Sequence, residues 1–411
     1  MIYDVVVVGA GPSGSTVARK VAEKGYRTLL CEEHEFVGKP CHCTGKLTAH
    51  AFREFNLPRE AILNSVGAAV FHSPKGTKLS IRGRGADSYV VDRELLDLRL
   101  AEMACDSGSE LSTQTRVHDL HRDPDGIVTL DAKRMNTHLK VKSRLIVDAE
   151  GARPTLPKRL GLRVKSELLV GLQYEMDDVC LVSPDCVELY FGSDLAPGFF
   201  AWIVPVSEDK ARVGLCIRKN KADQTVQYFL ERFVRNLMCS GRIRQRRILR
   251  TYAGVEPIGE PLTPSYTDSL LIVGDSAGQV KSTSGGGVYF GLKAAEIAAE
   301  TAAECLGRND VGSRSLARYE SGWKKAIGRE LRVTSLMRRV LDGLADDEID
   351  EIFQLMSEED IKGLIERYGD TAYQSRLLRP LLPVFLRKGA KPDRIVLLGK
   401  ILSSGLLSLM S

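Results

Sequence analysis

A glycine-rich turn near the start of the chain limits its fold more than any other feature of the sequence. Residues 3–8 form a β-branched run suited to a strand buried on both faces of a parallel sheet. Gly9-Ala-Gly11-Pro-Ser-Gly14 follows, and residues 15–24 then carry apolar side chains at helical spacing. A second apolar run at residues 27–31 completes a strand–helix–strand unit of about 30 residues. We therefore expect a parallel α/β sheet.

The turn also predicts a nucleotide site. Gly9 permits the tight turn, Gly11 lets a pyrophosphate approach the backbone, and Gly14 allows close packing of helix and strand. The helix N-terminus beyond them offers free N–H groups to phosphates. Glu32 ends the second strand, where a carboxylate can accept both ribose hydroxyls and would repel a 2′-phosphate. We therefore expect a dinucleotide at this turn, but not NADP.

A distant segment favours a flavin as part of this dinucleotide. Residues 269–275 form a buried-strand pattern that places Asp275 directly after Gly274. Further on, Gly285-Gly286-Gly287 opens a long alanine-rich helix. An aspartate can hold a polyol hydroxyl, and an uncapped helix start can stabilise negative charge on a reduced ring. FAD needs both groups, whereas the alternative is a glycine turn that only begins a helix.

The alternation of patterns predicts an α/β fold: a doubly wound FAD-binding domain, an inserted antiparallel β-sheet that forms a substrate or cap domain, and a helical C-terminal region. The predicted boundaries are 1–66, 92–160 and 268–310 for the FAD-binding domain, 67–91 and 161–267 for the cap domain, and 311–411 for the helical region.

Composition excludes several classes of protein. A chain of 411 residues with 43% hydrophobic and 27% charged residues is globular rather than disordered. A net charge of +5 is too dilute over this length to imply nucleic acid as a partner. Nine cysteines, an odd number scattered along a long chain, favour a reducing compartment. The chain shows no signal peptide and no apolar run of about 18 residues, so we expect a cytoplasmic protein.

These motifs together resemble flavoproteins of the p-hydroxybenzoate hydroxylase fold. That resemblance rests on the glycine turn with Glu32, on Asp92-Arg93 at the head of a helix, and on Gly274-Asp275. The stretch from Val273 to Gly291 looks more specifically like the geranylgeranyl reductase family. So does Gly38-Lys-Pro-Cys41 followed by Cys43-Thr-Gly45. The similarity extends from residue 1 to about residue 306.

The resemblance implies a set of FAD contacts and a reaction. The implied contacts are Gly9, Gly11, Gly14, Glu32, Cys43, Gly45, Arg93, Gly274, Asp275, Gly286 and Gly287. The implied reaction is reduction of isoprenoid double bonds, in archaea those of geranylgeranyl glycerophospholipids, and elsewhere those of chlorophyll or quinone side chains. A prenylated lipid is the expected substrate.

One strand departs from the family pattern. The reductases typically carry Pro-x-x-Tyr-x-Trp-x-Phe-Pro at the substrate cavity, and this chain has Pro197-Gly-Phe-Phe200-Ala-Trp202-Ile-Val204-Pro205. Phe200 and Val204 remove a hydroxyl and a ring but keep the strand apolar. We expect Phe200, Trp202 and Pro205 to line an apolar cavity. The strand is also loosely similar to the Trp-x-Trp-x-Ile-Pro box of flavin halogenases, so an FAD monooxygenase or halogenase of a small aromatic is the alternative function. A non-catalytic flavin-binding protein is a second alternative.

The chemistry requires an acid near the flavin. An isolated alkene accepts hydride poorly because nothing stabilises the resulting carbanion, so proton and hydride must arrive together. Cys43 resembles the cysteine that the family places near the flavin and is the first candidate for the acid; the alternative is a small residue packing a loop. Tyr289 could line the cavity or be a core residue. Cys41-His42-Cys43 with His50 lacks zinc-site spacing, and no metal is predicted.

Two further features bear on partners. Glu150-Gly151 replaces the Asp-Gly that contacts the pyrophosphate in the hydroxylases, and no second Gly-x-Gly-x-x-Gly is present, so electrons would come from transiently bound NAD(P)H or from ferredoxin. From Arg379 onward the chain is basic and apolar, with Ile395, Leu398, Leu402, Leu406 and Leu409 on one helical stripe. This stripe could pack on the core or contact anionic lipid, which would place the protein peripherally at the inner face of the cell membrane.

Overall fold

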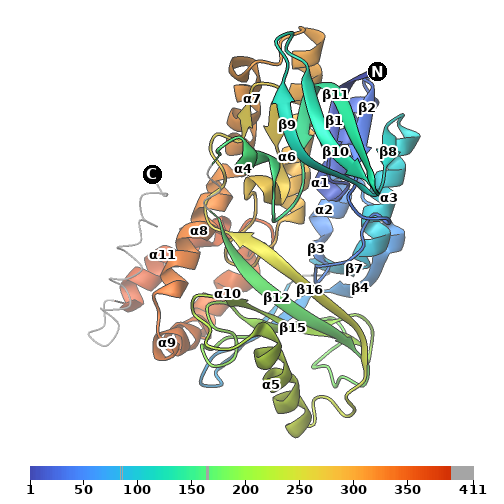
Figure 1. Cartoon of the computed structure of the whole chain (residues 1–411). Helices are drawn as coiled ribbons and strands as arrows, with labels where there is room; N and C mark the ends of the chain where they lie inside the picture. Colours follow the sequence, from blue (N-terminus) through green and yellow to red (C-terminus); the bar gives the residue numbers. More distant parts are fainter. Residues whose placement is uncertain (84, 86, 163–165, 390–411) are drawn as a thin grey trace.

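A largely parallel sheet forms the first unit of the computed structural model, which describes residues 1–83, 85, 87–162 and 166–389 (Figure 1). Its parallel part runs in the order β18 (Leu270–Ile272), β11 (Thr137–Asp148), β1 (Ile2–Val8), β2 (Thr28–Cys31) and β8 (Glu110–Ser112). β17 (Tyr266–Thr267) pairs antiparallel with β18 at one edge. β9 (Thr115–Arg122) and β10 (Val128–Arg134) continue antiparallel from β11. The predicted parallel sheet at the start of the chain is confirmed.

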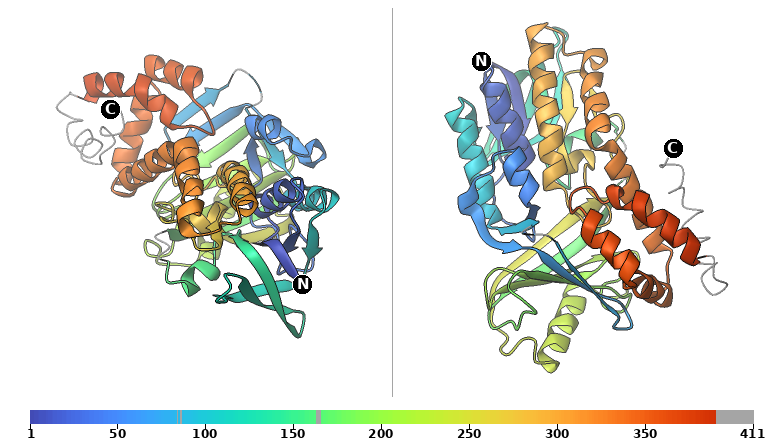
Figure 2. Two further views of the ribbon diagram at one scale, coloured as in Figure 1. Left: turned by 90° about the horizontal axis from the view of Figure 1, so that it is seen from above. Right: turned by 180° about the vertical axis from the view of Figure 1, so that it is seen from behind.

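The two faces of this sheet have different covers. Val5 and Val7 of β1 pack with α1 (Pro12–Ala22), α3 (Arg93–Asp106) and α6 (Val288–Gly307), and Figure 2 shows these helices grouped on one face. Val6 and Val8 pack instead with the hairpin of β9 and β10. The valine run of β1 is therefore buried on both sides, as its composition predicts. The expected α/β fold is present, with an antiparallel hairpin rather than helices on the second face.

A second, mainly antiparallel sheet lies below the first in Figure 1. Its order is β16 (Ile248–Ile258), β12 (Glu167–Met176), β15 (Ala211–Arg218), β14 (Ala201–Pro205), β13 (Cys186–Tyr190), β5 (Ala68–His72) and β6 (Lys78–Arg82). One face buries Tyr174, Val213 and Leu215 against α5 (Val226–Cys239). The opposite face carries Trp202 and Val204. This is the inserted antiparallel sheet expected from the sequence, and we call it the cap sheet.

A small sheet connects the two larger ones. It consists of β3 (Lys46–Thr48), β7 (Ser88–Val91) and β4 (Ile62–Val66). Along the chain, α2 (Ala49–Glu54) and a short 3-10 turn (Arg59–Ala61) connect β3 to β4. Within the predicted cap segment 67–91, β5 and β6 join the cap sheet while β7 pairs with β3 and β4. The domain boundaries given above remain a prediction.

The C-terminal region is helical as expected. It contains α7 (Ser313–Trp323), a π-helical turn (Lys324–Gly328), α8 (Arg329–Asp342), α9 (Asp346–Met356), α10 (Glu359–Tyr368) and α11 (Ser375–Gly389). Leu381 of α11 packs with Leu355, Ile361 and Ile365 of the two preceding helices. The predicted stripe from Ile395 to Leu409 lies outside the described residues. Within the described part of the chain, no helix has both the length and the apolarity needed to cross a membrane.

The start of α3 gives a stability test. Asp92 is the N-cap, and its carboxylate accepts the backbone N–H groups of Glu94 and Leu95 at 3.0 and 3.2 Å. We expect Asp92→Ala to lower the free energy of unfolding by about 1 kcal/mol, measured by urea denaturation, because both N–H groups lose their acceptor. Asp106→Ala at the other end of α3 is the control, since an acid there opposes the helix dipole. Equal midpoints for the two variants would contradict the assigned cap.

Candidate flavin site

Four strand ends meet at one edge of the parallel sheet. Beyond β1, the Gly9 N–H donates to the Cys31 carbonyl at 2.8 Å, which joins the end of β1 to β2. The Ala149 N–H donates to the Val8 carbonyl at 2.8 Å, which joins β11 to β1. The Val273 N–H donates to the Asp148 carbonyl at 2.9 Å, which joins β18 to β11. Open parallel sheets bind ligands beyond these carboxyl ends, so this edge is the candidate site.

The three glycines of the turn have distinct surroundings. Gly9 has a φ of +101°, and a Cβ there would overlap the carbonyl of Ala149. A Cβ on Gly14 would overlap the Gly9 carbonyl, so this glycine lets α1 pack on β1. A Cβ on Gly11 would meet no atom within 4 Å. Gly9 and Gly14 therefore serve packing, and Gly11 leaves the backbone open to a ligand.

Glu32 lies beside this turn, as its position at the end of β2 predicts. Its Oε2 accepts the Ala10 N–H at 3.0 Å, and its Oε1 accepts the His34 backbone N–H at 3.0 Å. The His34 ring nitrogen Nδ1 lies 2.7 Å from the same Oε1. The carboxylate is thus fixed at the edge of the turn, where a ribose would lie.

The Glu150 carboxylate binds the start of a short helix. Its Oε2 accepts the backbone N–H groups of Thr155 and Leu156, at 2.7 and 2.9 Å, at the start of α4 (Leu156–Arg159). The carboxylate is a helix-terminal acceptor in this structure. The neighbouring Gly151 has φ +82° and open space around it, so the backbone at Gly151 can still approach a ligand.

Gly274 and Asp275 converge with the glycine triplet. The Ser13 hydroxyl of the first turn lies 2.8 Å from the position a Cβ on Gly274 would take, so this part of the turn touches the end of β18. The Asp275 Oδ1 lies 2.6 Å from the corresponding position on Gly287, at the start of α6. Burial raises the pKa of Asp275, and the nearby Arg93 guanidinium opposes this shift. The first glycine turn, Gly274-Asp275 and the glycine triplet, which are far apart in the sequence, therefore lie together in the fold.

Arg93 joins this group from the first turn of α3. Its guanidinium binds the Asp97 carboxylate through two hydrogen bonds of 2.9 and 2.8 Å. The charge of Arg93 acts on Asp275 and on Cys41 of the loop before β3. Arg93 is thus held by Asp97 and faces the place where the strand ends and the cap sheet meet.

The loop of Cys43, Thr44 and Gly45 is held by the cap sheet. The Gln173 amide donates to the Cys43 carbonyl at 3.2 Å, and its oxygen accepts the Thr44 hydroxyl at 3.1 Å. The Arg212 guanidinium donates to the Thr44 carbonyl at 2.7 Å and occupies the space beside Gly45. Trp202 takes part, because its indole N–H donates to the Gln173 oxygen at 3.1 Å. We call this set the loop–cap contact.

The two cysteines of the loop differ in environment. The Cys43 thiol accepts the Gly45 N–H at 3.3 Å. The Cys41 thiol donates to the Cys43 carbonyl at 3.7 Å, and burial raises the pKa of Cys41 to about 11. Cys41 is therefore a neutral thiol at pH 7. Cys43 lies in the loop that faces the site, where either of its expected roles can be fulfilled.

Glu256 is an acid in the site that the sequence did not single out. It lies on β16, and its Cγ is 2.9 Å from the position a Cβ on Gly285 would take. Its Oε1 is sealed from solvent and has no hydrogen-bond partner among the described residues. Burial raises the pKa of Glu256 well above its usual value; Asp275 and Cys43 add to the shift and Arg93 opposes it. These surroundings therefore favour the protonated form of Glu256.

Two lysines lie near the glycine triplet, the buried Lys281 and the partly buried Lys46. Lys46 directly follows Gly45, and its Nζ donates to the Ser88 hydroxyl at 2.9 Å. Lys281 donates to the Thr371 carbonyl, and its Cε lies 3.2 Å from the position a Cβ on Gly286 would take. Burial lowers the pKa of each lysine to about 8. The surroundings of the triplet thus include acids with raised pKa values and lysines with lowered ones.

Of the residues predicted to line the cavity, Phe200, Trp202 and Pro205 lie on or beside β14 of the cap sheet, and Tyr289 lies on α6. Phe200 and Trp202 are 8% exposed and belong to an apolar cluster of the cap sheet face that also contains Val204. The Phe200 and Trp202 rings lie edge to face, with centroids 6.2 Å apart. Pro205 ends β14, and its carbonyl accepts the Asn64 amide at 3.1 Å. Phe200 and Trp202 therefore form an aromatic wall beside the loop–cap contact.

Tyr289 has the surroundings of a core tyrosine. Its hydroxyl donates to Glu54 Oε2 at 2.8 Å and lies 3.1 Å from the Tyr373 hydroxyl. Its ring packs against Phe55 and Phe290. Burial raises the pKa of Tyr289 above its usual range. The geometry favours the core alternative for this residue over a place in the cavity wall.

His42 and His50, the histidines considered as metal ligands, bind different protein groups. The His42 ring nitrogen Nδ1 lies 2.7 Å from the Ala253 carbonyl, and the His50 ring pairs with Glu54 at 3.0 Å. Over the residues that the structure describes, no three His, Cys, Asp or Glu side chains are grouped as a metal ion would require.

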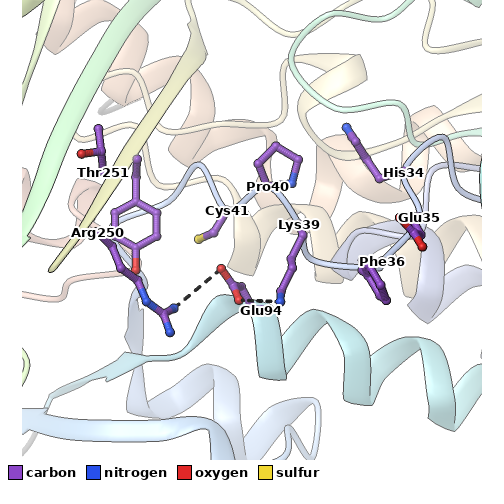
Figure 3. Close-up of a pocket in the computed structure, with 10 residues that line it drawn as sticks. His34, Glu35, Phe36, Lys39, Pro40, Cys41, Glu94, Arg250 and Thr251 are labelled. Carbon is purple, nitrogen blue, oxygen red and sulfur yellow. Dashed lines mark ion pairs between the residues drawn. The ribbon is translucent and has the colours of Figure 1, made fainter.

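A cavity of about 590 Å³ opens beside Cys41 (Figure 3). It lies between the loop from His34 to Cys41, the first turn of α3 and the start of β16. In Figure 3 Glu94 lies between two cations, with Lys39 Nζ at 3.6 Å and Arg250 Nη1 at 3.8 Å. The cavity therefore reaches the Cys41–Cys43 loop from the outside of the molecule and is lined by mixed charges.

The residues of this edge fit FAD. The open backbone at Gly11 suits a pyrophosphate, Glu32 lies where a ribose would be held, and Asp275 with the start of α6 suits a ribitol and a flavin ring. Glu256, whose Oε1 has no hydrogen-bond partner among the described residues, lies near Asp275 and Arg93. The fold and the site define an FAD-dependent oxidoreductase.

Comparison with known proteins agrees with this class. Residues 2–327 match the FAD binding domain family. The digeranylgeranylglycerophospholipid reductase of Methanocaldococcus jannaschii is 32% identical over 89% of this chain and 94% of its own length. Digeranylgeranylglycerophospholipid reductase 2 of Methanothermobacter thermautotrophicus is 31% identical over 93% of this chain and 100% of its own length. The chain therefore belongs to the FAD binding domain family and, within it, to the family of the digeranylgeranylglycerophospholipid reductases.

Solved structures show the same fold. A geranylgeranyl bacteriochlorophyll reductase-like protein from Thermoplasma acidophilum superposes with a TM-score of 0.84 at 24% identity, covering 94% of this chain and 98% of the other. A flavin-dependent brominase superposes with a TM-score of 0.69 at 17% identity, covering 94% and 100%. The agreement with the first structure extends to the mixed sheets and C-terminal helices described above.

The glycine assignments predict that one Gly→Ala substitution lowers stability and that another weakens FAD binding. Gly14→Ala should lower the free energy of unfolding of the apoprotein by about 2 kcal/mol, because its Cβ has no room beside the Gly9 carbonyl. Gly11→Ala should leave unfolding within about 0.5 kcal/mol of wild type. It should weaken FAD binding by about tenfold, measured by fluorescence titration, because its Cβ occupies the ligand side of the turn. A Gly11→Ala chain that binds FAD normally contradicts the assignment.

The loop–cap contact predicts a change in cysteine reactivity. Gln173→Leu leaves the buried Trp202 N–H without an acceptor and releases the Cys43 carbonyl. We expect the free energy of unfolding to fall by about 1–3 kcal/mol. Alkylation of Cys43, followed by mass spectrometry of the peptide, should become faster. Gln227→Leu on the exposed face of α5 is the matched control and should change neither quantity. Unchanged labelling of Cys43 in Gln173→Leu would show that this contact does not hold the loop.

Proposed function

We propose that this protein uses FAD to reduce isolated C=C bonds in the geranylgeranyl chains of membrane lipid precursors. The observation that carries the proposal is the aromatic wall of Phe200 and Trp202, which the cap sheet presents beside the Cys43 loop and the residues that fit FAD. The names of the reductase relatives, at 32% and 31% identity over nearly the whole chain, support the same substrate class.

The protein's own residues have three tasks in this reaction. Bound FAD in its reduced form supplies the hydride. Gly11, Glu32 and Asp275 bind and orient the cofactor at the strand ends. Phe200, Trp202 and Val204 exclude water and offer an apolar surface to an isoprenoid chain. The loop of Cys43 to Gly45 fixes the distance between these two sets, since Gln173 and Arg212 hold it against the cap sheet.

The departure at Phe200 is compatible with this function. A tyrosine hydroxyl at this position would be buried beside Phe199, whose ring stacks on Phe200 with centroids 4.3 Å apart. Phenylalanine keeps the surface apolar and needs no hydrogen-bond partner. A hydrocarbon substrate is therefore served without the hydroxyl. The halogenase alternative gains no support from the brominase structure, because a likeness at 17% identity shows the fold alone.

We propose NAD(P)H or ferredoxin as the source of electrons. The chain has no second Gly-x-Gly-x-x-Gly, so a pyridine nucleotide would bind transiently. The cavity in Figure 3 supports an approach beside Cys41, because it opens to the outside there and its lining includes Lys39 and Arg250, both paired with Glu94.

We also propose a cytoplasmic protein in peripheral contact with the inner face of the membrane. The substrate class requires access to lipid, and α11 carries the exposed Arg376, Arg379 and Arg387. Its apolar residue Leu381 packs inward, so the arginines rather than an apolar stripe would meet anionic headgroups.

The proposed reaction predicts a specific mass change. Dithionite-reduced protein incubated without oxygen with a geranylgeranylated glycerophospholipid should yield lipid that gains two hydrogens for each bond reduced, read by mass spectrometry. The flavin should return to its oxidised spectrum in step with this gain. A fully saturated lipid of the same headgroup is the control and should leave the flavin reduced. Unchanged mass of the geranylgeranylated lipid, or oxygen uptake coupled to a small aromatic, would reject the reductase function.

A further inference from the structure

The acids of the cap sheet show how unusual Glu256 is. Glu188 is fully buried but binds Arg242 and His72, and these partners bring the pKa of Glu188, which burial alone would raise, down to about 2. Glu175 accepts the Arg212 guanidinium at 3.0 Å. Each of these carboxylates has a cationic partner. Glu256 lies on the same sheet, yet its Oε1 has no partner in the described part of the structure.

The position of Glu256 directs this carboxyl to the reacting region. Its strand pairs Glu256 with Leu169, which belongs to the same apolar cluster as Phe200 and Trp202. Its side chain touches the Gly285 position at the start of the glycine triplet, and Cys216 lies in the same neighbourhood. The carboxyl is thus between the aromatic wall and the place where a flavin ring fits. A group in this position would be within reach of a substrate on the aromatic wall and of a cofactor at the glycine triplet.

The charged and titratable groups around Glu256 determine its protonation. They are Asp275, Cys43, Arg93 and Cys216. Arg93 is engaged by Asp97 through two hydrogen bonds, so it does not form an ion pair with Glu256. Burial and the nearby Asp275 raise the Glu256 pKa and so favour its protonated form. A carboxyl group with a raised pKa has the properties of a general acid.

We propose that Glu256 is the proton donor of the reaction, an inference that rests on the proposed function. The Glu256 O–H bond breaks as a C–H bond forms at one alkene carbon, while the hydride from the reduced cofactor forms a C–H bond at the other. The π electron pair of the alkene enters the bond to the proton. The Glu256 carboxylate that remains recovers a proton from water before the next double bond is reduced.

This assignment leaves Cys43 as a residue that shapes the site. The Cys43 thiol accepts the Gly45 N–H, and its carbonyl is fixed by Gln173, so both ends of the residue serve the loop. Glu256, by contrast, has an oxygen that no protein group in the described structure uses. If Glu256 is the proton donor, substitution of Glu256 should greatly slow the lipid reaction; if Cys43 is the donor, substitution of Cys43 should. Variants of the two residues therefore distinguish the candidates.

The test compares Glu256→Gln, Cys43→Ala and Glu260→Gln, the last an exposed acid four positions along the chain. Each holoprotein is reduced anaerobically and mixed with a geranylgeranylated glycerophospholipid or with ferricyanide, and flavin reoxidation is followed in a stopped-flow instrument. We expect Glu256→Gln to slow reoxidation by lipid about 10²- to 10⁴-fold and to leave reoxidation by ferricyanide unchanged. Glu260→Gln should stay within a few-fold of wild type with both acceptors, and Cys43→Ala, which alters the loop beside the cofactor, should slow the lipid reaction far less than Glu256→Gln does.

The outcomes separate the two proposals. If wild-type reduced protein never reacts with the lipid, the proposed function fails. If wild type reacts and Glu256→Gln reacts equally well, the donor assignment is overturned while the function stands. Loss of the lipid reaction in Cys43→Ala alone would make the cysteine the donor and also overturn it. Glu256→Asp, which keeps the acid but shortens the side chain, should recover part of the rate.

A measurement on the apoprotein tests the neutral acid without activity. Because the folded-state pKa of Glu256 is raised, its favourable contribution to folding is lost as pH rises through that pKa. Wild-type Tm should therefore fall more than the Tm of Glu256→Gln as pH rises above about 4.5, the ordinary glutamate pKa. In an infrared titration, a protonated carboxyl band that is absent in Glu256→Gln should persist in the wild type above that pH. Parallel Tm curves and no such band would overturn the proposal even if Glu256→Gln cannot bind FAD.

Discussion

The contact between one short loop and the cap sheet is the constraint on which the site depends. Gln173 and Arg212 bind the main chain of Cys43 and Thr44, and Trp202 binds the same Gln173 oxygen. Each hydrogen bond contributes only about 1 kcal/mol, but a buried donor left without an acceptor costs about 1–3 kcal/mol. The aromatic wall and the loop therefore keep one arrangement. Directional polar contacts hold the Cys43 loop beside the aromatic wall of the cap sheet.

Sequence patterns predicted the cofactor half of the site because its residues lie at strand ends and helix starts. A buried valine run, the turn at Gly9 and an acid at Glu32 are local features, and Asp92 begins its helix where the cap pattern indicates. Gln173, Arg212 and Glu256 were missed for a physical reason. They lie inside alternating strands, where a polar residue normally faces solvent. Only the pairing of β12 with β15 and β16, which are far along the chain, turns them inward.

The position of a residue in a motif does not by itself show what its side chain contacts. Tyr289 follows the glycine triplet directly, but α6 directs it to Glu54 and Tyr373, because consecutive helical residues point in different directions. Glu150 occupies the place of a pyrophosphate contact, yet its carboxylate binds the N-terminal N–H groups of α4. Both residues satisfy a local donor or acceptor first. A motif therefore predicts which backbone segments approach a cofactor more reliably than it predicts which side chains contact it.

A sealed carboxyl oxygen without a hydrogen-bond partner, such as Glu256 Oε1, needs a reason to persist. A polar group without a partner in an apolar site costs on the order of 2–7 kcal/mol of transfer free energy, and replacing Glu256 by an apolar residue would remove that cost. Its neighbours on the sheet avoid the cost by pairing, as Glu188 does with Arg242. Local rules are broken mainly where function requires it. Because alkene reduction needs a proton in a site that must otherwise stay dry, a neutral acid on the apolar side of the site is the kind of residue for which such a cost is retained.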